Sequence, residues 1–255
     1  MSPPWQVRRL AVCASTERQL ERWLLRDPPP EEDRGWRRMV VARRQRFGRG
    51  QQGRVWQSPA GGLWLSAAFP WPADASRAAA PALAMALGVA QELEALTLAA
   101  APLPLAIKWP NDLYLGGRKL AGLLPRLRLR GGRVRWAQLG LGLNGINRAP
   151  VGAIALGQAL QQPVGQRRLN SRLARFDPRA TPRALEVLAQ RAIERTLALA
   201  PHPERVRLEV EQRLWRTPEG IERDGVCWQV AGLERDGGLR VVDPTGGSAV
   251  WRRDF

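Results

Sequence analysis

The sequence is poor in the residues that hold metal centres and disulfide frameworks. It contains two cysteines, Cys13 and Cys227, and a single histidine, His202, which lies between two prolines. These counts exclude a Cys/His structural zinc site and a disulfide framework. The lone histidine also argues against catalysis by a Ser/His pair. We expect both cysteines to be reduced and to act as small buried apolar side chains in a cytoplasmic protein.

Long apolar runs are also missing. The N-terminal residues 1–15 have no apolar core and no cleavage pattern of the kind found in signal peptides. The least polar stretch, Ala78 to Val89, is interrupted by Pro81 and is too short to span a bilayer. The remaining composition, 44% hydrophobic and 25% charged over 255 residues, is typical of globular proteins. The sequence therefore predicts a folded cytoplasmic protein without a membrane partner.

The positive charge of the chain is carried almost entirely by arginine. Forty basic and 23 acidic residues give a net charge of +17, and only Lys108 and Lys119 are lysines. Such a charge could bind a nucleic-acid backbone. However, the arginines are scattered through every segment, and no helix-turn-helix, zinc finger or aromatic sheet motif is present to read bases. We keep nucleic-acid binding as an alternative, and expect the positive field to attract anionic small molecules and acidic proteins.

Hydrophobic periodicity predicts a mixture of strands and helices followed by a small β unit. Strands are expected at 7–12, 39–42, 63–69, 105–109 and 134–143, with a hairpin around Gly116-Gly117, and helices from Ser15-Thr16 to Arg26, over 78–98 and over 184–199. Residues 48–59 are expected to form a polar loop. Short strands at 226–230, 239–242 and 249–251 are separated by glycine-rich turns. We predict two domains, residues 1–205 and residues 206–255.

Three segments contain residues suited to phosphate and carboxylate chemistry. Residues 48–66, GRGQQGRVWQSPAGGLWLS, combine closely spaced glycines with arginines, so that backbone N–H groups and guanidinium groups can approach an anion. Residues 108–124, KWPNDLYLGGRKLAGLL, hold both lysines, whose compact ammonium groups can reach a carboxylate and a phosphate oxygen together. Residues 140–147, GLGLNGIN, follow a strand and offer asparagine amides. Each segment alone is also compatible with an ordinary surface loop.

In this order, the three segments resemble the signatures of the biotin protein ligase family. The first resembles GRGRxGRxWxSPxGGLxLS, the second KWPND…KxxGIL and the third GxGxN, and Ser15-Thr16 lies where the family has Ser-Thr-Asn. The resemblance implies an α+β fold, with a class II synthetase-like catalytic domain built on a mixed sheet with flanking helices and a small C-terminal SH3-like β domain. It also implies ATP-dependent attachment of biotin, through biotinyl-5′-AMP, to a lysine of a biotin carboxyl carrier protein, a subunit of acetyl-CoA carboxylase.

The resemblance also implies roles for individual residues. Lys119 and Arg49 would be catalytic, and Asp112 would help to hold Mg²⁺. The residues implied to bind biotin are Ser15, Thr16, Gln45, Arg49, Gly50 and Lys119, and those implied to bind ATP are Arg54, Trp56, Lys108, Asn111, Asp112 and Asn144.

The sequence departs from the family pattern at two positions of this implied site. Glu17 replaces the usual asparagine and Gln51 replaces a common arginine, which leaves their contacts to substrate in doubt. The competing enzyme is a lipoate or octanoate ligase of related fold, but its arginine- and glycine-rich strand followed by a histidine is missing. Because only 47 residues precede Gly48, we expect a ligase without repressor activity or specific nucleic-acid binding. A homodimer is compatible with the sequence.

Overall fold

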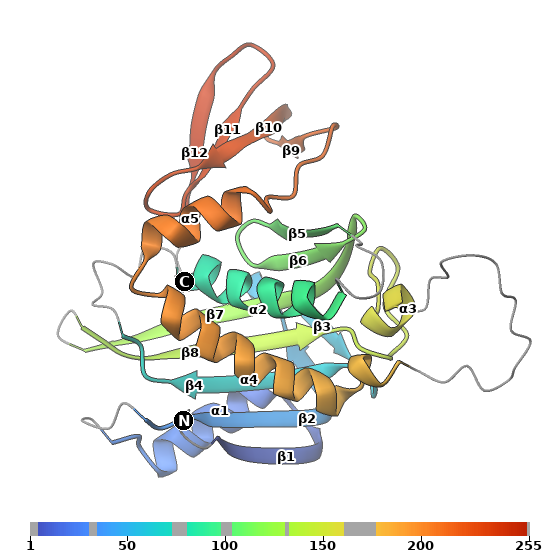
Figure 1. Ribbon diagram of the computed structural model, residues 1–255, viewed down its shortest axis with the longest axis vertical. Helices are drawn as coiled ribbons and strands as arrows, with labels where there is room; N and C mark the ends of the chain where they lie inside the picture. The colour runs from blue at the N-terminus through green and yellow to red at the C-terminus, as the bar shows by residue number, and fades with distance from the viewer. Residues whose placement is uncertain are drawn as a thin grey trace, which may run out of the picture.

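A mixed eight-stranded sheet forms the centre of the computed structural model (Figure 1). The structure describes residues 5–30, 35–72, 81–97, 104–130, 133–160 and 177–253. The strand order is β1-β2-β4-β8-β7-β6-β5, with β3 paired to β2. Strand β1 is parallel to β2, and the other neighbours in this sheet are antiparallel. The strands are β1 (Gln6–Cys13), β2 (Arg38–Arg49), β3 (Val55–Ser58), β4 (Leu63–Phe69), β5 (Leu105–Lys108), β6 (Asp112–Leu115), β7 (Arg118–Arg130) and β8 (Arg133–Leu143).

One face of the sheet is covered by α2 (Pro81–Thr97) and α4 (Pro182–Leu199), which lie across it in Figure 1. Side chains alternate between the two faces of a strand. On β4, the buried side chains of Leu63, Leu65 and Phe69 belong to the main core together with both helices. Strands β7 and β8 contribute leucines and alanines with the same alternation. This apolar layer is the hydrophobic core of the protein.

The other face of the sheet carries a smaller apolar cluster and leaves room beside it. Helix α1 (Thr16–Arg26) packs Leu20, Trp23 and Leu24 against Val40 and Ala68. Beyond this cluster, Ser66 of β4, Gly122 of β7 and Gly140 and Gly142 of β8 lie on this face and carry small side chains or none. A hollow forms over these four positions, all of which line the cavity described below.

A separate small sheet at the C-terminus confirms the predicted β unit (Figure 1). It follows α5 (Pro203–Glu211) and has the antiparallel order β12-β11-β10-β9, formed by β9 (Ile221–Arg223), β10 (Val226–Leu233), β11 (Leu239–Val242) and β12 (Ser248–Trp251). The proposed boundary between residues 205 and 206 falls inside α5, which also contacts α2. The division into 1–205 and 206–255 remains a prediction.

The largest difference from the sequence prediction lies in residues 48–59. These residues do not form a simple loop, because β2 continues to Arg49 and β3 pairs back onto it, with Gly48 opposite Trp56. The turn between them is closed by a hydrogen bond from Gly50 N to Arg54 O of 2.7 Å. The high glycine content conceals this hairpin from a prediction based on hydrophobic periodicity.

The structure also contains short elements that the sequence did not predict, including α3 (Leu156–Leu160). The prediction missed α3, α5 and β9, whose apolar repeats are too short to register. The predicted helix over 78–98 is present as α2, while residues 78–80 and 98 lie outside the described residues. None of the helices in the described ranges is long and apolar enough to cross a membrane.

A close approach of α2 and α4 at Gly88 predicts a sensitive position in the core. A Cβ atom at Gly88 would lie 2.6 Å from the carbonyl oxygen of Ala192 and would overlap the Thr196 hydroxyl. We expect Gly88→Val to lower the free energy of unfolding by about 1–3 kcal/mol through overpacking, as measured by urea denaturation. Val187→Ala on the partly exposed side of α4 is the control and should change it by less than about 0.5 kcal/mol. Equal stability of the two variants would contradict this packing.

Candidate functional site

A cavity of about 410 Å³ lies on the sheet face that α1 only partly covers. Its walls come from the start of α1, the β2–β3 hairpin, the β6–β7 hairpin and residues 150–153. Every site residue predicted from the sequence except Lys108 lines this cavity. The tertiary structure thus brings together segments that are more than a hundred residues apart in the sequence, such as those of Ser15 and Asn144.

One end of the cavity is polar but holds a network of uncharged groups. The side-chain oxygen Oε1 of Gln45 accepts hydrogen bonds from Thr16 N at 2.8 Å and Thr16 Oγ1 at 3.1 Å. Gln45 Nε2 donates to Ser58 Oγ at 2.9 Å, and Thr16 Oγ1 lies 2.9 Å from Ser66 Oγ. These mutual bonds fix the orientation of the amide and the hydroxyl groups. Together with Ser15, which is buried at 2% exposure, they form a rigid wall of neutral donors and acceptors.

The indole of Trp56 lies on a glycine floor between the two ends. Gly122 and Gly142 are paired on neighbouring strands, and a Cβ atom on either residue would collide with the ring of Trp56. The indole also meets Trp64 edge-on, with 6.4 Å between the ring centroids. Trp56 Nε1 is buried and has no hydrogen-bond partner within the described part of the chain. The glycines therefore determine where this aromatic surface can lie.

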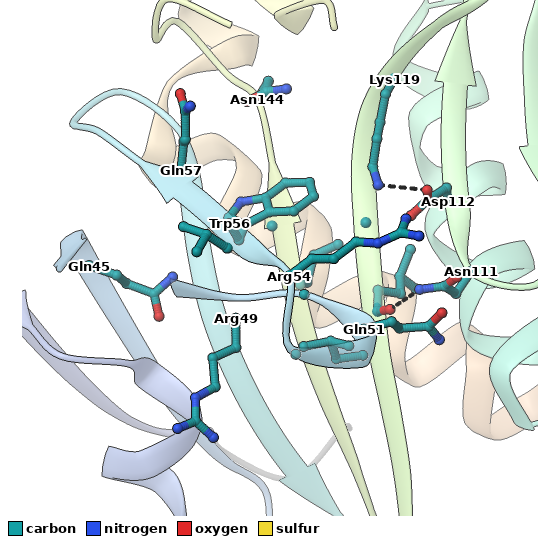
Figure 2. A pocket seen from close by; sticks show the side chains of 18 of the residues that line it. Gln45, Arg49, Gln51, Arg54, Trp56, Gln57, Asn111, Asp112, Lys119 and Asn144 are labelled. Atoms are coloured by element: carbon teal, nitrogen blue, oxygen red, sulfur yellow. Dashed lines mark hydrogen bonds and ion pairs between the residues drawn. The ribbon is translucent and has the colours of Figure 1, made fainter. Parts of the chain in front are cut away.

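The opposite end of the cavity is charged. Lys119 Nζ forms an ion pair with Asp112 Oδ2 at 2.6 Å and lies 5.1 Å from the centroid of the Trp56 ring. Figure 2 shows the side chain of Arg54 extending toward Asp112, so that a second cationic group lies at this end of the cavity. The backbone of Lys119 is held between Gly152 O, which accepts from Lys119 N at 3.3 Å, and Ile154 N, which donates to Lys119 O at 3.0 Å.

Two asparagines border this charged end and are held by hydrogen bonds. The amide Nδ2 of Asn111 donates to the carbonyl oxygen of Leu123. Asn144 Oδ1 accepts from Asn147 Nδ2 at 3.0 Å, and Asn147 Oδ1 accepts from Gly145 N at 2.9 Å. Asn147 is 6% exposed and positions Asn144 at the cavity wall. Both asparagine side chains are thus fixed in place.

Two cationic residues predicted to belong to the site point elsewhere. Lys108 is outside the cavity lining, and its Nζ lies 3.4 Å from Tyr114 Oη and 4.8 Å from the Trp215 ring centroid. Arg49 borders the cavity, but Figure 2 shows its guanidinium group directed away from Lys119 and Trp56. Their roles toward ATP and biotin remain predictions.

Some lining residues were not among the predicted contacts. Ser66, Gln57 and Tyr114 also line the cavity. The signal for Ser66 is its place in the predicted strand 63–69, where it is a single polar residue among apolar ones. Glu17, a departure from the family pattern, lines the cavity and forms an ion pair with Arg126 Nη1 at 2.9 Å. This pair neutralises the carboxylate where a neutral amide was expected.

The charged end offers a single carboxylate for a divalent cation. Across the described ranges, no three His, Cys, Asp or Glu side chains are grouped so that they could hold a metal ion by themselves. Asp112 fits the way in which Mg²⁺ is commonly held beside a nucleotide, by one or two carboxylates with the other ligands supplied by phosphates and water. The residues therefore fit a Mg²⁺ ion that arrives with a phosphate substrate.

Comparisons with known proteins show the family to which the chain belongs. Residues 17–144 match the model of the biotin/lipoate A/B protein ligase family. The chain is 36% identical over 107 residues to the bifunctional ligase/repressor BirA of Bacillus spizizenii, covering 42% of this chain and 32% of the relative. It is 38% identical over 119 residues to the biotin–[acetyl-CoA-carboxylase] ligase of Paracoccus denitrificans, covering 46% of this chain and 48% of the relative. These matches thus span about half or less of each relative.

Solved structures show the same fold along nearly the whole chain. The biotin protein ligase from Aquifex aeolicus in complex with biotin and ATP aligns with a TM-score of 0.65 at 22% identity, covering 97% of this chain and 99% of that one. The biotin protein ligase from Leishmania major in complex with biotinyl-5-AMP aligns with a TM-score of 0.61 at 20% identity, covering 98% and 100%. The expected catalytic fold with a small C-terminal β domain is thereby confirmed.

The two cysteines differ in their exposure, and this predicts different reactivity. Burial raises the pKa of the Cys13 thiol, which lies two residues before Ser15, so less of it is thiolate at a given pH. Cys227 is exposed, contrary to the expectation that both are buried. At pH 8 we expect Ellman's reagent to modify Cys227 at least about tenfold faster than Cys13. Cys227→Ser should remove the fast phase, and a fast phase that survives would contradict the prediction.

Proposed function

Because this chain belongs to the biotin/lipoate A/B protein ligase family, we propose that it activates biotin with ATP and transfers it to a lysine of a biotin carboxyl carrier protein. The observation that carries the proposal is the division of one cavity into a neutral hydrogen-bonding end and a cationic end, with Trp56 between them. Biotin has the matching shape, with an uncharged cyclic urea, an apolar chain and a terminal carboxylate.

The neutral end would bind the urea group of biotin. A urea donates two N–H bonds and accepts at its oxygen, and the wall of Ser15, Thr16 and Gln45 offers both donors and acceptors. Bound there, the substrate directs its carboxylate along the Trp56 surface toward Lys119. A wall of charged side chains would be a poorer match, because the uncharged urea group would leave those buried charges unpaired.

The cationic end would bring two anions together in the first step. A carboxylate oxygen of biotin attacks the α-phosphorus of ATP, and the bond to the β-phosphate oxygen breaks, so that pyrophosphate leaves with the electron pair. Lys119 and Arg54 reduce the repulsion between the carboxylate and the triphosphate and stabilise the charge that develops on the phosphoryl oxygens. Asn111 and Asn144 border the same end and would contact the nucleotide.

The second step transfers the biotinyl group to the acceptor. The neutral amine of the acceptor lysine attacks the acyl carbon of biotinyl-5′-AMP, the acyl carbon–oxygen bond breaks, and AMP leaves with the electron pair. The attacking nitrogen then releases one proton to the solvent, which completes the amide. Lys119 can also stabilise the negative charge on the departing phosphate, because the same phosphate lies beside Lys119 in both steps.

We assign the proposed Mg²⁺ ion to Asp112, the carboxylate at the cationic end. When bound there with ATP, Mg²⁺ would neutralise phosphate charge. Asp112 also orients Lys119 through their ion pair. A cytoplasmic location and a homodimer remain predictions from the sequence.

Mass spectrometry of a carrier domain tests the proposed activity. We expect incubation with this protein, ATP, Mg²⁺ and biotin to add one biotinyl group to the carrier lysine. Octanoate and lipoate are the competing substrates, and their corresponding carrier domains serve as acceptors in parallel reactions. Adenylate formation with octanoate but not with biotin would replace this proposal by a lipoate-type ligase.

The two lysines provide a matched pair of variants. Lys119→Ala should lower biotin-dependent exchange of labelled pyrophosphate into ATP by about 10²–10³-fold or more, because a preorganised cation is lost at the reacting groups. Lys108→Ala is the control, since Lys108 lies outside the cavity, and we expect a loss below about tenfold. Circular dichroism checks that both variants fold. Normal exchange by Lys119→Ala would remove Lys119 from the mechanism, whereas equal losses would return Lys108 to the nucleotide site.

A further inference from the structure

Arginines are concentrated on one element at the cavity mouth. We use the name basic hairpin for residues 43–55, which include the end of β2 and the start of β3. Its five arginines are all exposed: Arg43, Arg44, Arg46, Arg49 and Arg54. The sequence has no acidic residue between Asp33 and Asp74. The basic hairpin therefore lacks any acidic neighbour in the sequence.

Arg54 extends toward Asp112 (Figure 2), but within the described residues no carboxylate forms an ion pair with any of these arginines. Elsewhere, many arginines form ion pairs, including Arg195 with Glu92 at 2.6 Å, Arg207 with Glu204 at 2.6 Å and Arg213 with Glu94 at 2.7 Å. Within the described ranges, none of the five hairpin arginines has a carboxylate at ion-pair distance. Such a group of like charges opposes compact folding and attracts anionic partners.

Small substrates account for only part of this charge. Arg49 and Arg54 border the cavity, where they can meet the phosphates of ATP. Arg43, Arg44 and Arg46 are not among the lining residues, although two of them flank Gln45 directly in the sequence. At about 3.3 Å per residue along a strand, their backbones lie within roughly 7 Å of that of Gln45. The cavity and its small ligands therefore do not account for these three arginines.

Exposed apolar side chains accompany the charge. Phe47 is 67% exposed and Val55 is 81% exposed, both on the basic hairpin, and Val151 across the cavity is fully exposed. Val55 and Val151 also line the cavity. Protein interfaces combine exposed apolar anchors with arginines, whereas a nucleic-acid backbone is bound mainly by charge. The combination favours a protein partner.

We propose that the basic hairpin is the docking surface for the acceptor protein, and that it recognises an acidic surface around the acceptor lysine. This inference rests on the proposed function and adds the chemistry of the partner. The hairpin forms one wall of the cavity, so a domain that inserts a lysine there comes close to it. Docking would increase the encounter rate through charge attraction and would orient the lysine toward the acyl carbon.

Charge variants outside the cavity lining test this docking surface. The variant R43E/R44E/R46E lowers the formal charge from +17 to +11. With preformed biotinyl-5′-AMP and an acetyl-CoA carboxylase carrier domain, we expect kcat/KM for transfer to fall about ten- to a hundredfold. The glutamine variant R43Q/R44Q/R46Q should show a smaller loss. Raising the salt concentration should slow the native protein more than either variant, because the ions screen the attraction.

A matched control has the same change in net charge at exposed arginines elsewhere. The variant R191E/R235E/R253E places the reversals on α4 and in the C-terminal segment, and its transfer rate should stay within about threefold of the native value. Biotin-dependent pyrophosphate exchange, measured without carrier, should stay within about twofold in both triple variants. Changing the acidic residues of the carrier domain to amides should lower kcat/KM for transfer by the native protein. The same carrier change should lower transfer by R43E/R44E/R46E much less.

Several outcomes of these experiments would overturn the docking proposal. Unchanged transfer by R43E/R44E/R46E, or equal losses in the control variant, would exclude a specific docking surface. If R43E/R44E/R46E lost retention of duplex DNA but kept normal transfer, the basic hairpin would instead be a nucleic-acid surface. Absence of pyrophosphate exchange in the native protein would refute the proposed function itself. Normal exchange with charge-insensitive transfer would refute only the docking surface.

Discussion

The two faces of one sheet impose opposite requirements on the same strands. Toward α2 and α4, strands β4, β7 and β8 present leucine, alanine and phenylalanine, and the burial of these side chains stabilises the fold. Toward the cavity, the same strands present Ser66, Gly122 and Gly142. Because side chains alternate, every apolar residue in the core determines which neighbouring residue faces the cavity. A register shift of one residue would fill the cavity and expose the core.

The glycine floor gives the aromatic ring a defined position. An indole can lie flat against the backbone of β7 and β8 only where no Cβ atoms intervene, and Gly122 and Gly142 supply two such positions side by side. From there, Trp56 separates the neutral hydrogen bonds around Gln45 from the ion pair of Lys119 and Asp112. The resulting polarity gradient is what makes a ligand with one neutral end and one anionic end the best match.

Two groups of arginines in the protein have different consequences. Arg195 on α4 and Arg205 and Arg207 on α5 are paired with glutamates within those helices or on neighbouring elements, and they contribute to the surface rather than to a site. Exposed pairs of this kind contribute little to stability, typically less than about 1 kcal/mol each. The arginines of the basic hairpin have no such carboxylates in the described structure, so their field extends to the cavity mouth. Net charge alone does not distinguish these two groups.

The sequence by itself determined the family and the elements with strong periodicity, and all predicted site residues except Lys108 line the cavity. The resemblance of three segments to the family's signatures implied these residues, whereas each segment alone is compatible with an ordinary surface loop. Only the tertiary structure decided that Lys108 turns toward Trp215 while Lys119 turns toward Asp112. It also decided that residues 48–59 form a hairpin, since pairing between strands depends on contacts that local composition does not encode. Side-chain direction and ion pairing depend on neighbours from distant parts of the chain, and only folding brings these together.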